Sequence, residues 1–503
     1  MKALPEKDPS MKHVLRAARP MAVAALTLAL AACVMPPRRL DPPTLGDNVP
    51  LAGLDVPERA DWPSPEWWKA YHDDQLDRLI DEAMSKAPDL EVARSRVGSA
   101  EQSVRAAAAQ AGLSIDGSAQ ISRQRMSEHG LIPARFLGFT WYNQADIGVQ
   151  LQYDFDWWGK TRAAVESAVD QAHAAEAQRS AAAIALQYAV ADTYFGWQAD
   201  QARLALARQQ LLVQEHLFRI AQLRVKQGVD LPDDASRAQA QLAAAREMQV
   251  AIDRSGQIRL AALASLVGIA PDQLPKLQPR PLPDVSGGLP TGASLDLIAR
   301  RPDIAASRWQ VEAALRQTDV ARAQFLPDLS LRALAGLSSI DLGKLFSASS
   351  RTFAVTPALH LPLFSSGLLQ ANYGMSRAQL EGTVAQYRSV VLQAARDVAT
   401  QALTAEMLAE RRAQQQTQIE ADQQILRAAQ ARARQGVRDA REPLAAEAQL
   451  LQQQDAATQL QAQAVSTDLA LIKSLGGGYR MPDASAPATA PTSLPPSSGA
   501  HSR

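Results

Sequence analysis

The 503-residue sequence has one cysteine, few aromatic residues and no surplus of charge of either sign. A single cysteine excludes a disulfide framework within one chain and any site built from several cysteines. Lysine plus arginine equals aspartate plus glutamate, at 52 each, so nothing argues for a nucleic-acid surface. Aromatic residues make up only 5%, and alanine dominates the 47% hydrophobic share. That composition is thin for a large globular core, but it suits long helices packed closely through small side chains.

The N-terminal segment joins a basic leader to an uncharged, mostly apolar run of twelve residues, Met21–Ala32. A helix needs about 20 residues to span a bilayer, so this shorter run indicates a secretory signal instead. It ends in Leu-Ala-Ala-Cys33, which resembles a bacterial lipobox, in which the cysteine becomes the lipidated first residue after cleavage. We therefore expect a covalent lipid on Cys33 and no other cofactor, and Val34 after it points to the outer membrane. The start of the chain is then Met1 or Met11.

An internal repeat covers most of the sequence. Three pairs of matching segments carry it: Leu151–Gly159 with Leu359–Gly367, Arg224–Val229 with Arg432–Val437, and Pro88–Leu90 with Pro302–Ile304. The first two pairs are 208 residues apart and the third is 214 residues apart, so the first copy carries six extra residues between these landmarks. A duplication of this length requires each half to contribute an equivalent structural unit.

Four segments alternate apolar and polar residues, as β-strands do: about 113–127, 142–157, 328–340 and 352–364. They predict either a soluble antiparallel sheet with one buried face or a membrane barrel with one face in lipid. Strands of about ten residues, the aromatics Tyr153, Phe155 and Trp157 near a strand end, and the lipobox favour the barrel. Four strands cannot close a barrel, since bacterial barrels need about eight or more and open edges are costly in lipid. Several chains must then pool their strands, and three would supply twelve.

The strands lead into helices of unusual length. Residues 160–227 contain no proline and one interior glycine, which allows about 68 helical residues, roughly 100 Å in all. Apolar residues recur there every seven positions, as in a coiled-coil seam. Gly228 ends this helix, and the second copy repeats the pattern from about 368 to 435 with Gly436 as the break. Each half is therefore predicted to be strand, strand, long helix, tight turn and returning helix.

Motifs for catalysis or metal binding are missing. Gly159-Lys160-Thr161 looks like the end of a phosphate-binding loop, but Asp154 stands where that loop needs a glycine. The seven histidines include no His-x-x-x-His pair, and no Gly-x-Ser-x-Gly elbow occurs. We therefore predict that the chain is not an enzyme and holds no metal.

Several segments together resemble the TolC-like outer membrane efflux proteins, in the lipoprotein branch called OprM/NodT. They are Trp67-Trp68, Asp74–Ile80, Tyr153–Lys160, Ala299–Ile304, Ala321–Pro327 and Leu475–Gly478. The resemblance implies a homotrimer that is lipid-anchored in the outer membrane and spans it, docked on a periplasmic adaptor protein and an inner-membrane pump of the resistance-nodulation-division type. Drugs or other toxic small molecules would pass through it passively.

The expected fold is mainly α with a membrane β part, a trimeric twelve-stranded β-barrel that continues into a long coiled-coil periplasmic tube. Five parts are predicted along the chain: a lipoprotein signal peptide (1–32), a lipidated tether (33–65), a first repeat (66–283), a second repeat (284–480) and a disordered tail (481–503). The helical hairpins of the two repeats turn at Gly228 and Gly436.

The resemblance also assigns roles to the two hairpin turns. The tip that contacts the adaptor would consist of Gly228, Val229, Gly436 and Val437, although glycines that only reverse a helix would look the same. The candidate aperture gate consists of Asp234, Arg438, Arg441 and Glu442, each of which could also belong to an ordinary solvated helix end. Ala445 stands where the family has an aspartate, and Ala433 stands where it has a tyrosine. The aperture is therefore expected either to be looser or to rely on Arg438, Arg441 and Glu442.

Three alternatives share parts of this pattern. A periplasmic adaptor has a long helical hairpin, but only one, whereas this sequence predicts two, each preceded by strands. A structural coiled-coil lipoprotein would need no strands. An outer membrane export channel of a protein secretion system shares the whole fold, and the sequence leaves it open.

Overall fold

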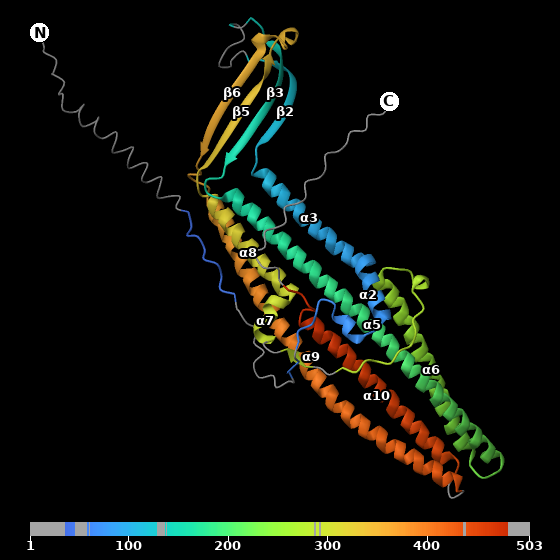
Figure 1. Ribbon diagram of the computed structural model, residues 1–503. Coiled ribbons are helices and arrows are strands. Elements are labelled where there is room, and N and C mark those ends of the chain that lie inside the picture. The colour runs from blue at the N-terminus through green and yellow to red at the C-terminus, as the bar shows by residue number, and fades with distance from the viewer. Residues whose placement is uncertain are drawn as a thin grey trace, which may run out of the picture. The chain divides into compact units, whose positions relative to one another are not determined.

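The structure is a computed structural model that describes residues 36–45, 58–59, 61–127, 136, 138–285, 288–290, 293–435 and 439–480 (Figure 1). The expectations for the signal peptide 1–32, for Cys33, for Gly436, Val437 and Arg438, and for the tail 481–503 lie outside the described residues. The chain forms two compact units, one mainly of residues 84–183 and 306–394, the other mainly of residues 61–83, 184–305 and 395–480. Each unit draws on both repeats, so the predicted boundary near residue 284 separates repeats but not compact units.

One antiparallel sheet in the first unit has the strand order β2-β3-β5-β6 (Figure 1). The strands are β2 (Ser114–Arg125), β3 (Trp141–Phe155), β5 (Asp328–Ser339) and β6 (Arg351–His360), and the short 3-10 helices η3 (Leu342–Lys344) and η4 (Ala348–Ser350) connect the last two. All four lie where alternation predicted strands. Strand β6 ends at His360, four residues earlier than expected.

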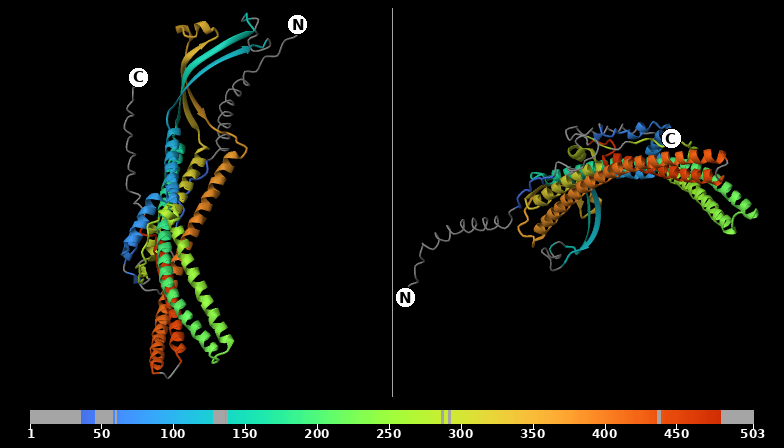
Figure 2. Two further views of the ribbon diagram at one scale, coloured as in Figure 1. Left: turned by 90° about the vertical axis from the view of Figure 1, so that its right-hand side faces the viewer. Right: turned by 90° about the horizontal axis from the view of Figure 1, so that it is seen from below.

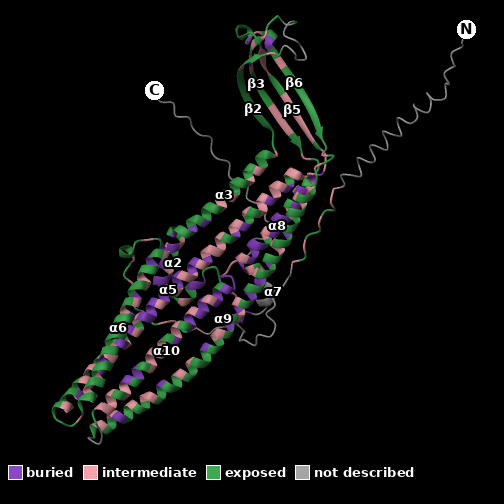
Figure 3. Ribbon diagram, turned by 180° about the vertical axis from the view of Figure 1, so that it is seen from behind, coloured by how far each residue is buried: buried purple, intermediate pink, exposed green. Residues whose placement is uncertain are grey.

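The pairing register gives this sheet one apolar face and one polar face. Along one row across the sheet, Ile115 pairs with Leu151, Leu151 with Ala333, and Ala333 with Val355. The adjacent row, Ser114–Gln152–Arg332–Thr356, is polar and points to the other side. In the single chain the apolar face is not covered, since Val355 is 68% exposed, and Figure 3 shows hardly any buried residue in β6.

The repeat is visible in the element boundaries. Helices α5 (Lys160–Lys226) and α9 (Leu368–Arg434) both have 67 residues and are offset by 208 at each end. Strands β2 and β5 are likewise offset by 214 at each end. The six extra residues of the first copy therefore lie between Arg125 and Lys160, in the connection to β3 and in β3 itself. The predicted order of strand, strand, long helix, turn and helix is confirmed.

Helix α5 begins at a sharp turn that its sequence specifies. Gly159 adopts φ +75°, in the left-handed region that favours glycine, as Gly367 does before α9 at +83°. Asp156 then accepts hydrogen bonds from the backbone N–H groups of Thr161 and Arg162, at 3.1 and 2.8 Å. These bonds satisfy two of the otherwise unpaired donors at the helix start.

Helices α3 (Pro88–Gln110) and α8 (Pro302–Ala323) pack in the first unit with the first parts of α5 and α9. The Ser167 hydroxyl of α5 donates to the Ala313 carbonyl of α8 at 3.0 Å. None of the described helices is both long enough and apolar enough to cross a membrane.

The second unit contains η1 (Trp67–Tyr71), α2 (Asp74–Lys86), α6 (Pro232–Val267), η2 (Pro271–Gln273), α7 (Ala293–Arg300), α10 (Arg441–Ser474), the remainder of α5 and α9, and the two-residue strands β1 (Glu58–Arg59) and β4 (Leu289–Pro290). In Figure 2, α5 runs beside α6 and α9 beside α10, so each long helix returns as a hairpin. Helix α2 is amphipathic, since Leu76, Leu79 and Ile80 on one of its faces are buried.

A buried polar cluster ties α2 to α5 in this unit. The Tyr194 hydroxyl donates to the Asp73 carboxylate at 2.6 Å, and the Arg280 guanidinium contacts the same carboxylate at 3.0 Å. Burial raises the pKa of Tyr194, so its hydroxyl stays protonated and keeps donating.

Two segments of the family resemblance, Ala299–Ile304 and Leu475–Gly478, lie side by side at the end of α10. Arg301 is 8% exposed, and its guanidinium donates to the Ser474 carbonyl at 2.8 Å and to the Asp303 carboxylate. Gly476 follows with φ +94°, so close to Arg300 that a Cβ atom would overlap the Arg300 carbonyl oxygen. Glycine is therefore required at this position for space as well as for conformation.

Candidate functional site

The first hairpin tip is built around Gly228, which has φ +68°. The N–H of Val229 donates back to the Arg224 carbonyl at 2.9 Å and so ends α5. Val229 and Leu231 are then left 58% and 71% exposed on the turn. Two of the four residues assigned to the tip, Gly228 and Val229, thus lie at the turn itself.

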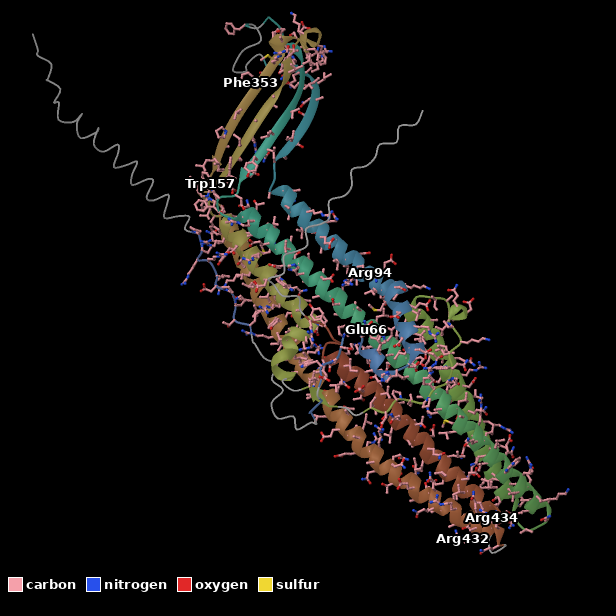
Figure 4. All side chains as sticks on the ribbon, in the orientation of Figure 1. Glu66, Arg94, Trp157, Phe353, Arg432 and Arg434 are labelled. Atoms are coloured by element: carbon pink, nitrogen blue, oxygen red, sulfur yellow. The ribbon has the colours of Figure 1, made fainter. Side chains whose placement is uncertain are left out.

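An arginine at the equivalent position of each repeat forms an ion pair across the turn of its hairpin. Arg224 and Arg432 each stand four residues before the turn glycine of their copy. Arg224 contacts the Asp230 carboxylate at 2.8 Å, and Arg432 contacts the Glu442 carboxylate at 2.6 Å. In each copy, an ion pair therefore joins the end of the long helix to a carboxylate that follows the turn of the same hairpin. Figure 4 marks Arg432 at this end of α9.

Arg441 links one hairpin tip to the other. Its guanidinium contacts Asp230 of the first hairpin at 3.1 Å and Asp439 of the second at 2.8 Å. Arg224 also approaches Asp439, at 3.6 Å. The four side chains form a closed network of two arginines and two aspartates, called the tip network below.

The ion pairs of the tip network lower the pKa values of its two aspartates. The hydrogen bond from Arg224 lowers the pKa of Asp230, and that from Arg441 lowers the pKa of Asp439. A lowered pKa means that the ion pairs persist at neutral and mildly acidic pH. They are lost only when the pH falls below the usual carboxylate range.

The candidate gate residues separate into different roles. Arg441 joins the two hairpins, and Glu442 pairs within its own hairpin. Asp234 instead caps its own helix, because its carboxylate accepts the Leu231 N–H at 3.2 Å and lies 3.4 Å from Arg237. Ala445 is exposed and Ala433 half-buried.

Sequence reasoning missed Arg224, Asp230 and Asp439. The signal for the first was present, since an arginine stands four residues before the turn glycine in both copies. Asp230 and Asp439 sit at different offsets from their glycines, so the repeat alone does not reveal them.

A groove of about 530 Å³ lies between α5, α6 and α10 in the same unit. Its lining combines small and apolar side chains with glutamines, among them Gln210 and Gln214 of α5. Within the described part of the chain, the side-chain oxygens of these two glutamines are buried and have no hydrogen-bond partner. Such orphaned acceptors at a groove favour a partner that donates hydrogen bonds.

The family model, the relative and the two solved structures that follow each match most of this chain. A family model described as outer membrane efflux protein matches residues 79–269 and 294–477. The multidrug resistance outer membrane protein MdtP of Escherichia coli K12 is 34% identical over 445 residues, which cover 87% of this chain and 90% of that protein. The crystal structure of the outer membrane protein VceC of Vibrio cholerae is similar with a TM-score of 0.73 and 32% identity, covering 83% of this chain and all of that one. The outer membrane channel OprN is similar with a TM-score of 0.79 and 26% identity, covering 89% and 99%.

Proposed function

This chain belongs to the outer membrane efflux protein family, and we propose that three copies of it form one passive channel for small molecules. The chain is an outer membrane channel subunit of an efflux system, and its family is not enzymatic. Drug-like or other toxic molecules are the proposed cargo, supported by the similarity to MdtP, a multidrug resistance outer membrane protein. Energy for their movement comes from a partner pump, since a passive tube does no chemistry.

The sheet is the observation that carries the trimer. Within the described residues, the edge strands β2 and β6 each pair with one neighbour only, so each offers a free edge. Open edges in lipid leave backbone groups without hydrogen bonds, which is prohibitively costly. Three copies would pair β6 of one chain with β2 of the next and close a twelve-stranded barrel, with the apolar face in lipid and the polar face around the channel.

The hairpin tips are the proposed contact for a periplasmic adaptor protein. Support comes from the exposed Val229 and Leu231, which offer apolar side chains at the turn, and from the glutamine-lined groove between α6 and α10. Gly436 and Val437 complete this proposed tip in the second copy. An inner-membrane pump of the resistance-nodulation-division type is the proposed energy source.

We assign gating to the tip network. Ala433 and Ala445 occupy two gate positions of the family, whereas Arg441 contacts an aspartate of each hairpin in this chain. Purified protein in planar bilayers, with no pump and no energy source, should show a small resting conductance. Arg441→Ala should raise it several-fold, because the contact between the hairpins through Asp230 is lost. Glu442→Ala should raise it less, because it loosens one hairpin only.

The matched control is Arg434→Ala, which removes an exposed arginine from the same end of α9, outside the tip network (Figure 4). It should leave the conductance unchanged. If Arg441→Ala and Glu442→Ala both behave like the control, these residues have no part in the gate. If the wild-type protein does not conduct at all, the proposed channel function fails.

Lipidation is proposed at Cys33. Because Cys33 is the only cysteine, Cys33→Ser should abolish incorporation of radiolabelled palmitate into the protein completely. The wild-type chain, expressed in parallel, provides the labelled reference, and immunoblotting confirms equal amounts of protein. Persistent labelling of the serine variant would exclude the lipobox interpretation.

A further inference from the structure

The apolar face of the sheet is charged at one end only. On this face, the charged strand residues are Arg123 and Arg125 of β2 and Arg351 of β6, and all three are exposed. Carboxylates of the strands occur on the opposite face, for example Asp116 and Asp146, each of which is adjacent in sequence to residues of the apolar face and therefore points to the other side. A face that otherwise carries Ile, Val, Leu and Ala thus holds three positive charges and no negative one.

These arginines lie at the end of the sheet that is distant from the helices. Strand β2 runs away from α3 and ends at Arg125, and β6 begins at Arg351 and runs back towards α9. Figure 4 shows Phe353 near the distal end and Trp157 near the helical end. Since the helices extend into the periplasm, the distal end belongs to the outer leaflet of the outer membrane.

The arginines occupy the two edge strands, so they are brought together by closure of the barrel. We propose that each seam between neighbouring copies binds the phosphorylated head group of one lipid A molecule, the saccharolipid of the outer leaflet. Arg351 of one copy and Arg123 with Arg125 of the next supply the charge. This inference rests on the trimer of the proposed function.

The chemistry of the seam fits a lipid with several phosphates. A guanidinium donates two parallel hydrogen bonds to a phosphate, which makes arginine well suited to such head groups. Arg123 and Arg125 are two residues apart on one strand, so their Cα atoms are separated by about 7 Å. A single phosphate therefore does not bind both of these arginines and Arg351 at once. A bisphosphorylated disaccharide is broad enough to engage both strands.

Aromatic residues next to the arginines suit the acyl chains. Trp141 and Phe353 share the apolar face at this end and are 54% and 84% exposed. The Arg123 guanidinium stacks 5.5 Å from the Trp141 ring, which holds its charge at the level of the membrane interface. Arginine on a lipid-facing surface is tolerated near the interfaces but costly at the bilayer centre, which agrees with its confinement to one end.

Native mass spectrometry of the purified full-length protein in detergent tests the site. The probes are bisphosphorylated lipid A, monophosphoryl lipid A and phosphatidylglycerol, each titrated separately. Wild-type trimer should retain one bisphosphorylated lipid A per seam, with weaker retention of the monophosphoryl form and weakest retention of phosphatidylglycerol. Arg351→Gln should weaken retention about tenfold, the loss expected for one charge-assisted contact. The triple variant Arg123→Gln, Arg125→Gln, Arg351→Gln should abolish it.

Arg332→Gln is the matched control, because Arg332 is an exposed arginine of the same sheet on the polar face. It should retain lipid A like the wild type. Equal retention by the triple variant, equal loss in the Arg332 variant, or equal binding of phosphatidylglycerol each overturns the lipid A site. The same spectra report the oligomer: trimers without bound lipid A overturn this inference alone, whereas absence of trimers from the wild type overturns the proposed assembly.

Discussion

Val149→Lys should prevent the protein from accumulating as a channel in the outer membrane, whereas Gln150→Lys should leave it in place. Val149 lies mid-strand on the apolar face, paired with Gly117 and Ala335, and is 50% exposed. A lysine facing the bilayer centre costs about 2–4 kcal/mol, and the trimer would carry it three times around one axis. Membrane fractionation followed by electrophoresis of unheated samples measures the assembled channel.

Gln150 provides the matched control, because the adjacent residue of the same strand points to the opposite, polar face. A lysine there meets water in the channel and costs little. If both variants assemble equally well, the apolar face does not contact lipid. Loss of both would show that β3 tolerates no lysine on either face, which contradicts the prediction that Gln150 faces water in the channel.

Gly476→Ala should destabilise the second unit by more than about 2 kcal/mol and strongly reduce the amount of folded protein. The left-handed conformation alone costs an alanine about 1–2 kcal/mol. The new methyl group would also overlap the Arg300 carbonyl, which is backbone and cannot swing aside, next to the buried Arg301 contact with Ser474. Limited proteolysis of the purified protein, followed over time, measures the loss.

The matched control is Gly98→Ala in helix α3. A Cβ atom there would meet nothing within 4 Å, and alanine favours a helix interior over glycine by roughly 0.5–1 kcal/mol. Gly98→Ala should therefore be as resistant to proteolysis as the wild type, or more so. If Gly476→Ala resists proteolysis equally, the close approach to Arg300 is not required for folding.

The strands and long helices could be predicted because they depend on local periodicity. Alternation located β2 and β5, and the absence of proline between residues 160 and 227 allowed the single helix α5. The duplication did more, because it required both hairpins and both strand pairs to recur. Prediction was incomplete where neighbouring residues allow more than one interpretation. The run from Gly476 to Gly478 has the sequence of a helix end, but its contact with Arg300 cannot be inferred from the sequence.

The candidate gate residues show most clearly what could not be predicted from the sequence alone. Asp234 and Arg441 are both charged residues just beyond a turn, and the sequence offers no reason to separate them. In the structure Asp234 caps its own helix, whereas Arg441 contacts Asp230 of the other hairpin. Asp230 and Arg441 are more than 200 residues apart, so only the packing of the two hairpins brings them together.

By itself, the sequence determined the repeat, the strands, the long helices and the family, since these follow from patterns between neighbouring or regularly spaced residues. The tertiary structure alone decided the strand order, the continuity of the apolar face across four strands, and which charges meet at the tips. Those features depend on contacts between distant segments, whose energies come from packing and desolvation that no local pattern encodes.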